Sequence, residues 1–348
     1  MNLHHISKLI SNTIDLLDLD LTGFTVLTEA ASGYYAVTPV IAAMAHADRV
    51  IALTSDSPYA SVQEVISQTR ALEQACGQNG RIEIHSKRSP DLFSQADIIT
   101  NLGFVRPIDN DIISLLKSTA VIPYMCEGWE IRATDVDLNA CWKKEIPVLG
   151  TNEEYPKLNI LSYCGWLCIK MMMNAHIEPS HANILIVSGD KFGPVIVKLF
   201  KKLGLSAKLV VSLRGAFEML LQSDVIIIAD YTRDDEIIGS HGDISPEVLA
   251  HINPSISIIQ FAGINNVEEI LHNDIMIYPE TKLQPHRMAL TLSELGPRPV
   301  IELHTLGLKV GEVLARARKE KGLGMLETIQ YAQDNSPGDL MEIWKVKK

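Results

Sequence analysis

Two series of short apolar segments, alternating with helical patterns, constrain the fold of this chain more than any other feature. The first series runs from a strand pattern at residues 24–28 to one at residues 146–149, and the second runs from residues 183–187 to residues 274–278. Strands that alternate with helices form parallel sheets with helices on both faces. We therefore expect an α/β protein built from two doubly wound parallel-sheet, Rossmann-like domains.

A helical pattern between the two series indicates how the domains join. Residues 158–173 are apolar nearly all round, which is typical of a helix buried on every side. We expect this buried interdomain helix to join a first domain, residues 1–157 plus 290–348, to a second domain, residues 158–289. A length of 348 residues suits two such domains.

The charge and the cysteine content exclude several classes of partner. The 42 acidic residues outnumber the 31 basic residues, and the net charge of -11 repels both phosphate backbones and anionic lipids. No apolar run approaches the roughly 20 residues that span a bilayer. Five cysteines without a C-x-x-C pair fit a reducing compartment. We expect a cytoplasmic protein without a nucleic-acid partner, a membrane partner or a metal site.

Three passages carry a family resemblance. Residues 135–148 read DVDLNACWKKEIPV, residues 223–230 read SDVIIIAD with ISIIQFAG at 256–263, and residues 283–286 read LQPH. They are similar to the N-x-D-L-x-A-A…G-I-P-V, A-D-V-V…N-x-A-R-G and T-P-H passages of the D-2-hydroxyacid (formate/glycerate) dehydrogenase family. The resemblance implies that residues 158–289 form a Rossmann dinucleotide-binding domain that takes NAD or NADP. It also implies that residues 1–157 plus 290–348 form a flavodoxin-like substrate or catalytic-type domain. Residues 259–269 also resemble, more loosely, the cofactor domain of S-adenosylhomocysteine hydrolases.

The resemblance implies three catalytic residues. His286 matches the family's acid–base histidine, and Glu280, which ends the preceding strand, matches the glutamate that orients it. Where the family has the arginine of A-R-G, which grips a substrate carboxylate, this chain has the glycine of A-G-I. Arg106, which follows a strand of the first domain, is the cation that we expect in its place, with Arg132 and Arg298 as alternatives.

The predicted phosphate loop departs from the family pattern G-x-G-x-x-G. Its residues are Ser188, Gly189, Asp190, Lys191, Phe192 and Gly193, and only the last glycine is in register. The carboxylate of Asp190 repels an anion where a glycine lets the backbone approach the pyrophosphate, and Lys191 would offset that repulsion. The loop is therefore open to two interpretations: a remodelled nucleotide loop, or a Rossmann fold that has lost its cofactor.

Four further residues complete the predicted cofactor site. At the end of the second strand, where an acid would bind the ribose of NAD, this chain has Ser212 and Arg214. A hydroxyl and a guanidinium suit a 2′-phosphate, so we expect NADP in preference to NAD. Asp230 and Gln260 lie within the family-like passages and are expected to contact the same cofactor.

These features favour an NAD(P)-dependent oxidoreductase of the D-2-hydroxyacid dehydrogenase type that acts on a small polar, carboxylated metabolite. The altered loop and the missing arginine keep open an alternative, a cofactor-poor, non-catalytic Rossmann-type binding protein. A two-domain glycosyltransferase is a third option, which the order of the elements disfavours. The resembling family dimerises around its interdomain region, and the apolar excess of residues 158–173 leads us to expect a homodimer here too.

Overall fold

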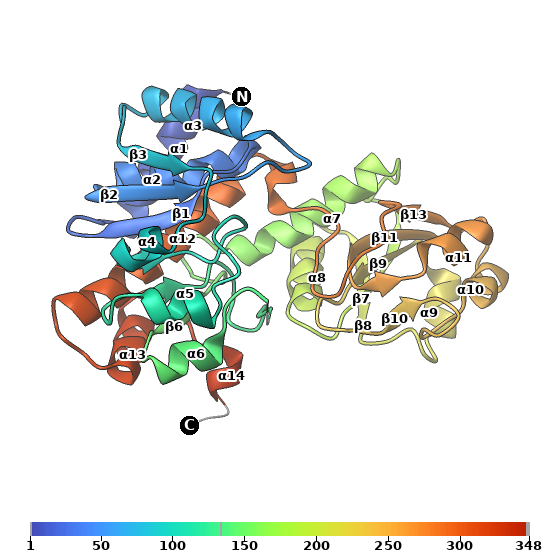
Figure 1. Cartoon of the computed structure of the whole chain (residues 1–348). Coiled ribbons are helices and arrows are strands. Elements are labelled where there is room, and N and C mark those ends of the chain that lie inside the picture. Colours follow the sequence, from blue (N-terminus) through green and yellow to red (C-terminus); the bar gives the residue numbers. More distant parts are fainter. Residues whose placement is uncertain (1, 133, 346–348) are drawn as a thin grey trace. The chain divides into compact units, whose positions relative to one another are not determined.

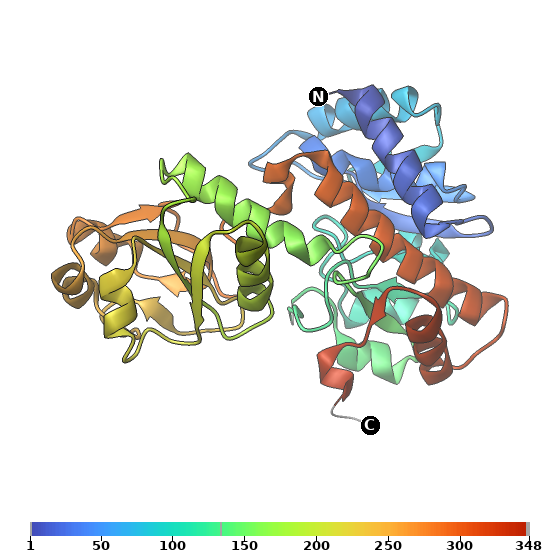
Figure 2. The ribbon, with the colours of Figure 1, turned by 180° about the vertical axis from the view of Figure 1, so that it is seen from behind.

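The computed structural model describes residues 2–132 and 134–345, which fold into two compact units (Figure 1, Figure 2). Unit 1 comprises Met1–Ile160 and Gly296–Lys348, and unit 2 comprises Leu161–Leu295. Each unit contains a parallel β-sheet with helices on its faces. The predicted α/β fold with two parallel-sheet, Rossmann-like domains is confirmed.

Unit 1 is built around one sheet. Its strands are β1 (Thr25–Glu29), β2 (Arg49–Leu53), β3 (Ile82–His85), β4 (Ile98–Ile99), β5 (Ile122–Pro123), β6 (Val148–Thr151) and the antiparallel β14 (Gly338–Asp339). A parallel bridge between Ile98 and Val121 connects the β4 side of the sheet to the β5 side, so the order is β3-β2-β1-β4-β5-β6 among the described residues. The central strands β1 and β2 are buried over most of their length. The apolar sequence VIAL of β2 fits this burial, whereas β1 also buries the polar Thr28 and Glu29.

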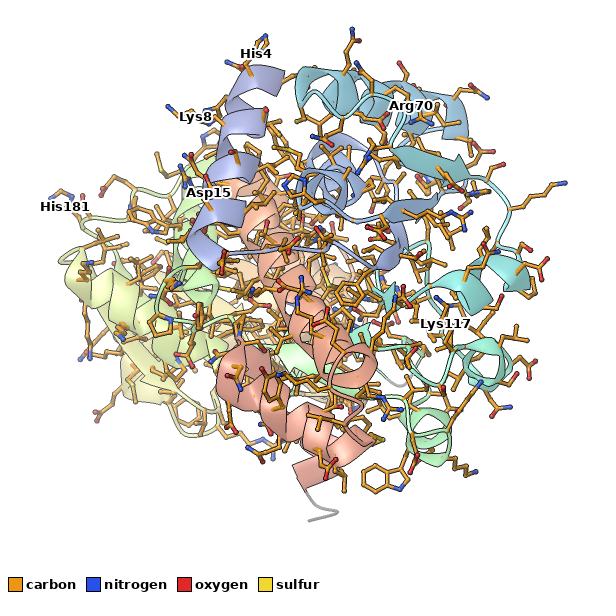
Figure 3. All side chains as sticks on the ribbon, turned by 90° about the vertical axis from the view of Figure 1, so that its left-hand side faces the viewer. His4, Lys8, Asp15, Arg70, Lys117 and His181 are labelled. Carbon is orange, nitrogen blue, oxygen red and sulfur yellow. The ribbon has the colours of Figure 1, made fainter. Side chains whose placement is uncertain are left out.

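Helices cover the sheet of unit 1, and α1 shows why they form. Ile6 and Ile10 of α1 face the core, whereas His4, Lys8 and Asp15 lie on its exposed face (Figure 3). This amphipathic pattern is the sequence signal of a helix packed on a core. The helices are α1 (Leu3–Leu17), η1 (Gly33–Ala36), α2 (Val37–Met44), α3 (Val62–Ala75), α4 (Pro90–Gln95), α5 (Asn110–Leu115), α6 (Leu138–Lys143), α12 (Pro297–Lys319), α13 (Met325–Asn335) and α14 (Glu342–Lys345).

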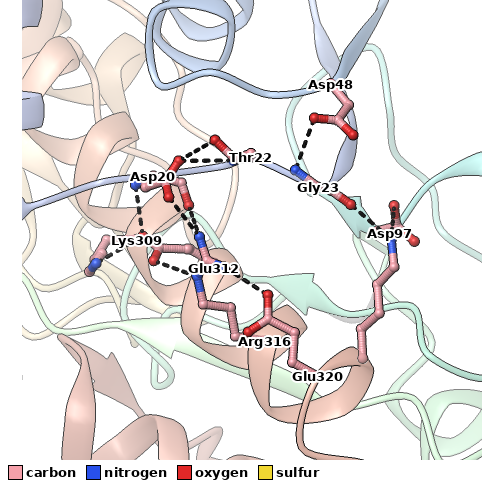
Figure 4. Close-up of polar contacts among 10 residues, drawn as sticks. Asp20, Thr22, Gly23, Asp48, Asp97, Lys309, Glu312, Arg316 and Glu320 are labelled. Carbon is pink, nitrogen blue, oxygen red and sulfur yellow. Dashed lines mark hydrogen bonds and ion pairs between the residues drawn. The ribbon is translucent and has the colours of Figure 1, made fainter.

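The long helix α12 ties the C-terminal part of the chain into unit 1 (Figure 4). Arg316 donates to Asp20 Oδ2 at 3.0 Å, to Glu312 Oε1 at 3.0 Å and to Glu320 Oε1 at 2.7 Å. The other oxygen of Glu312 accepts the Asp20 N–H at 3.1 Å and Lys309 Nζ at 2.8 Å. This network fastens α12 to the segment that leads into β1.

Unit 2 contains the second sheet. Its strands are β7 (Asn183–Val187), β8 (Ser206–Val210), β9 (Val225–Ala229), β10 (Glu236–Ile238), β11 (Ser257–Ala262), β12 (Ile264–Asn265) and β13 (Met276–Tyr278). Its helices are α7 (Tyr163–Asn174), α8 (Phe192–Lys202), α9 (Phe217–Gln222), α10 (Pro246–Ile252), α11 (Val267–His272) and η3 (Leu292–Leu295). The main sheet has the order β13-β11-β9-β7-β8, and β10 pairs separately with β12.

The strand orders correct one expectation. Unit 1, expected to be flavodoxin-like, has the order 3-2-1-4-5-6 that is typical of dinucleotide-binding domains, whereas unit 2 has the flavodoxin-like order 2-1-3-4-5. The connection that follows the second strand differs between the two units. Residues 211–224, which follow β8, contain only α9 before the chain enters β9 on the other side of β7. Residues 54–81 contain α3 and still carry the chain to β3, outside β2.

The predicted interdomain helix begins later, and is less buried, than its sequence suggests. A short 3₁₀ segment, η2 (Ile160–Ser162), precedes α7, and Asn159 before it has a left-handed φ of 50°. Within unit 2, α7 packs against α8. Trp166 and Met173 nevertheless remain 43% and 62% exposed, so this helix is not buried all round.

Candidate functional site

The predicted nucleotide site lies at the carboxyl ends of β7 and β9 in unit 2. The chain leaves β7 for β8 on one side, while β9 lies on the other, and such a switch in direction is where open α/β sheets bind ligands. Residues 188–193 connect β7 to α8, and residues 230–234 follow β9. Hydrogen bonds join these two segments, so the structure brings the predicted phosphate loop and Asp230 together.

The backbone N–H groups of the loop have acceptors within the chain itself. In a nucleotide-binding loop such groups point toward the phosphates at the start of the helix. Here they donate to side chains: Gly189 to Asp230 Oδ2 at 2.8 Å, Asp190 to Ser188 Oγ at 3.3 Å, Phe192 to Asp190 Oδ1 at 2.8 Å and Gly193 to Ser188 Oγ at 3.1 Å. The loop is therefore closed by its own polar side chains.

Asp190 supplies the anion that the loop holds. Its Oδ1 accepts Ser188 Oγ at 3.0 Å as well as the Phe192 N–H, and its Oδ2 accepts the Tyr231 N–H at 2.6 Å. Burial raises the pKa of Asp190 above its usual value, and these hydrogen bonds only partly oppose that rise. A carboxylate at the start of α8 lies where the helix dipole favours negative charge, and it repels a phosphate from the same place.

Aromatic side chains pack beside the closed loop. Phe192 lies edge-on to Tyr231 and to Phe261, with ring centroids 5.8 and 5.3 Å apart, and Tyr231 lies 5.6 Å from the ring of His286. Phe192 and Tyr231 are each only 2% exposed. A nucleotide at this edge of the sheet would have to displace these packed rings.

Ser212 and Arg214, the residues expected to contact a 2′-phosphate, bind a carboxylate of the chain. Asp243 accepts Ser212 Oγ at 2.6 Å, Arg214 Nε at 3.1 Å and two nitrogens of Arg233 at 3.0 and 3.1 Å. Burial raises the pKa of Asp243, but the hydrogen bonds from Arg233 and Ser212 outweigh burial and lower the pKa to about 2. The negative charge of Asp243 therefore stands where a 2′-phosphate would need an unpaired cation.

Gln260, the last of the predicted cofactor contacts, lies inside unit 2. Its side chain is fully buried, with Nε2 donating to the Thr281 carbonyl at 2.7 Å and Oε1 accepting Asn265 Nδ2 at 3.0 Å. These contacts fasten the segment after β13 to β11. They indicate a structural role for Gln260.

His286 lies at the same carboxyl edge, beside a carboxylate that the sequence did not single out. Its Nε2 is 3.1 Å from Asp234 Oδ1, and the imidazole is half-buried. The Ala289 N–H donates to the Phe261 carbonyl at 2.8 Å, which holds the segment after His286 against β11. Glu280, the expected partner, is exposed. In the sequence, Asp234 lies in the run TRDDE that follows β9, and this acidic run is the feature that could have identified it.

Arg106, the expected substrate cation, lies in unit 1 and pairs with a buried acid there. Its Nη1 donates to Asp135 Oδ2 at 2.9 Å, and Arg132 Nη1 lies 3.6 Å from the same oxygen. Asp135 is 2% exposed. The charge of Arg106 thus compensates a buried carboxylate of its own unit. Lys191, the predicted cation of the phosphate loop, is exposed in unit 2.

In this structure the groups that would hold a dinucleotide are bound by side chains of the chain itself. The donors that would hold its pyrophosphate are satisfied by Ser188, Asp190 and Asp230, and the strand end that would hold its ribose carries Asp243. In the described part of the chain, no group of three or more histidine, cysteine, aspartate or glutamate side chains could hold a metal ion. No helix there is long and apolar enough to cross a membrane.

Comparison with known proteins reveals a likeness of fold without a likeness of sequence. No protein-family model and no curated protein sequence matches the chain. A dipicolinate synthase subunit from Bacillus halodurans is 13% identical, with coverage of 84% of this chain and 99% of that chain and a TM-score of 0.50. The 3-phosphoglycerate dehydrogenase of Entamoeba histolytica, solved with bound NAD⁺, is 14% identical, with coverage of 78% and 96% and a TM-score of 0.44. A D-isomer specific 2-hydroxyacid dehydrogenase family protein from Aeromonas salmonicida is also 14% identical, with coverage of 79% and 96% and a TM-score of 0.34. This chain is thus similar to the dipicolinate synthase protein in fold, and that similarity concerns the fold alone.

Proposed function

We propose that this chain is a cofactor-poor, non-catalytic Rossmann-type binding protein for a small polar metabolite. The observation that carries the proposal is the position of Asp190, whose carboxylate takes the place of a phosphate at the start of α8. The surrounding N–H groups, the packed rings of Phe192 and Tyr231, and Asp243 at the next strand end all support a site closed to dinucleotides.

The energetic cost of opening the loop supports this choice. A dinucleotide would have to replace the three hydrogen bonds that Asp190 accepts, and hydrogen bonds to a charged group contribute about 1.5–3 kcal/mol each. The phosphates would regain part of this energy by accepting from the same N–H groups, but the displaced carboxylate would lose its partners. Repulsion between the displaced carboxylate and the phosphates adds to that cost.

A thermal-shift titration with NADH and NADPH tests the proposal. A ligand at about 100 times its dissociation constant adds roughly 2.7 kcal/mol of stability, which is seen as a higher melting temperature. We expect no rise for the wild-type protein at about 1 mM of either dinucleotide. The variant Asp190→Gly, which frees the Phe192 and Tyr231 N–H groups, is expected to respond more strongly than the wild type. A clear rise for the wild type would overturn the proposal.

The His286–Asp234 pair favours a second candidate function. A histidine beside a carboxylate at the carboxyl edge of the sheet is the arrangement of a general acid–base. This candidate is the NAD(P)-dependent oxidoreductase of the D-2-hydroxyacid dehydrogenase type, acting on a small polar, carboxylated metabolite, with NADP in preference to NAD. It requires the wild-type chain to bind NADPH in the same titration, and turnover to disappear in His286→Ala with binding intact.

A further inference from the structure

Unit 1 has a switch point of its own, between β1 and β4. From β1 the sheet continues through β2 and β3 on one side and through β4, β5 and β6 on the other. Ligands of open α/β sheets bind outside the carboxyl ends of the strands that flank such a point. In unit 2 the equivalent point is closed by Asp190 and aromatic rings. The switch point of unit 1 is the other place in the fold where this rule locates a ligand.

The register of β1 and β4 places two polar side chains next to each other at this point. Leu27 pairs with Ile99, and the Thr100 N–H donates to the Leu27 carbonyl at 3.0 Å. Two residues further along each strand, Glu29 and Asn101 occupy adjacent positions on the same face of the sheet, because side chains alternate with a period of two. Neighbouring strands are about 4.8 Å apart, so one small molecule at this end of the sheet can contact both side chains.

Both side chains are buried, and Asn101 has a hydrogen-bond donor to spare. Glu29 is 5% exposed and Asn101 is 2% exposed. Asn101 Oδ1 accepts the Met125 N–H at 2.8 Å, whereas its Nδ2 makes no hydrogen bond to any residue that the structure describes. Nδ2 is not one of the fully buried side-chain atoms that lack a partner, so it reaches the surface at this edge of the sheet. The N–H groups of Asn101 are therefore available to a molecule that enters at this edge.

Glu29 complements that donor with an acceptor. Its Oε2 accepts the Phe104 N–H at 3.1 Å, and a Cβ at Gly103 would lie 3.1 Å from the same oxygen, so the loop after β4 packs closely on the carboxyl group. Burial raises the pKa of Glu29, and the backbone N–H groups of Phe104 and Gly103 and the charge of Arg106 only partly oppose that rise. A buried carboxyl group with incomplete compensation is stabilised by a further hydrogen-bond donor.

We propose that Glu29 and Asn101 bind a vicinal diol of a small neutral sugar or cyclitol at the switch point of unit 1. One hydroxyl donates to the Glu29 carboxyl group, and the oxygen of the neighbouring hydroxyl accepts from Asn101 Nδ2. Neutral polyols suit this pair because Arg106, the cation near Glu29, is already paired with Asp135. This inference rests on the proposed function, since it names the class of metabolite that the binding protein takes.

Binding of D-glucose, D-mannose, D-galactose and myo-inositol to the full chain, measured by isothermal titration calorimetry, tests the inference. Asn101→Asp keeps the acceptor for the Met125 N–H and replaces the donor with a second acceptor. Glu29→Gln keeps an acceptor for the Phe104 N–H and alters the group that faces the diol. We expect at least one of the four compounds to bind the wild type and each variant to weaken that binding at least tenfold. Glu178→Gln, an exposed substitution in unit 2, is the matched control and leaves the affinity unchanged.

The possible outcomes separate this inference from the proposed function. Loss of affinity in Asn101→Asp with an unchanged melting temperature supports the diol site, because a residue that only anchors the loop would change stability and leave affinity intact. Wild-type affinity in both variants, or no binding of any of the four compounds, overturns the diol site. Binding of NADH or NADPH by the wild type overturns the proposed function whatever the sugars do.

Discussion

Two aspartates of unit 2, Asp190 and Asp243, show how the hydrogen-bond partners of a carboxyl group set its pKa. Asp190 is half-buried and bound by neutral hydroxyl and N–H donors, and its pKa rises. The side chain of Asp243 is buried, but the guanidinium of Arg233 and the hydroxyl of Ser212 lower its pKa to about 2. A charged donor stabilises the ionised form far more than neutral donors do. Asp190 thus follows β7 as an acid bound by neutral donors, whereas Asp243 contacts the residues after β8 as part of an ion pair with Arg233.

The pH dependence of stability depends on a third group, the buried His304 of α12. Burial lowers the pKa of His304 from 6.5 to about 4, and its Nδ1 lies 2.5 Å from Thr38 Oγ1. Between these two pH values the unfolded chain binds a proton that the folded chain does not, so acidification favours unfolding. We expect this residue alone to remove roughly 3 kcal/mol of stability as the pH falls from about 6.5 to about 4.

Urea unfolding of the wild type and of His304→Gln at about pH 7 and about pH 4.5 measures this contribution. Glutamine has a hydrogen-bonding group for Thr38 but no titration in this range. The variant should therefore lose less stability than the wild type between the two pH values. Equal losses in the two proteins would contradict the assignment, because the remaining titrating groups are common to both.

Among the elements, those with a long amphipathic pattern were predictable from the sequence. The pattern predicts a helix at residues 61–76, and α3 spans Val62–Ala75, with Ser61 and Glu64 forming a capping box at its start. By contrast α4, β10 and β12 have six residues or fewer, and no pattern of that length distinguishes them from loops. Tertiary contacts decide such short elements, so local sequence does not report them.

The candidate site was predictable only in part, for a related reason. The position of the loop and the anomaly of Asp190 were visible in residues 188–193, because a strand, a loop and a helix follow one another there. The contacts of Ser212 with Asp243 and of His286 with Asp234 join segments that are distant in sequence. Such contacts form only when the strands assemble into a sheet. The local sequence pattern does not specify the order of the strands in that sheet.

The helix α12 allows a test of how one element contributes to stability. Arg316→Met keeps an unbranched apolar side chain, but it removes the guanidinium over the Phe24 ring and the hydrogen bonds to Asp20, Glu312 and Glu320. Glu312 is 5% exposed and keeps Lys309 as its remaining cation. We expect a loss of about 2 kcal/mol in the free energy of unfolding, the usual size for a buried charged hydrogen bond.

Urea unfolding of Arg316→Met at neutral pH measures that loss. Lys8→Met, on the exposed face of α1, is the control for removing a surface cation and should change the stability by less than about 0.5 kcal/mol. Similar values for the two variants would show that the network in Figure 4 contributes nothing beyond an ordinary surface charge.

At the scale of the whole molecule, we propose that the chain forms a homodimer through the exposed face of α7. Trp166 and Met173 are one heptad apart and lie on the same side of this helix, with 43% and 62% of each side chain exposed. Lys170, between them, is paired with Glu294 at 3.2 Å. An exposed tryptophan and methionine around a neutralised cation form a surface that a second copy can cover symmetrically.

Light scattering coupled to gel filtration tests the dimer. We expect the wild type to elute with twice the mass of one chain, and Trp166→Glu to elute as a monomer because the substitution places a charge at the centre of the contact. Leu326→Glu, at an exposed apolar residue of unit 1, should leave the mass unchanged. A monomeric wild type would rule out the dimer under these conditions.

The return of the C-terminal segment to unit 1 has a consequence for the order in which the protein is made. Helix α12 packs on α1, α2 and the strands β4, β5 and β6, so the first unit lacks a covering layer until residues 297–319 have been synthesised. All residues of unit 2 leave the ribosome before that helix does. On the ribosome, the middle of the chain can therefore complete its fold first, while the N-terminal sheet still has an apolar face exposed.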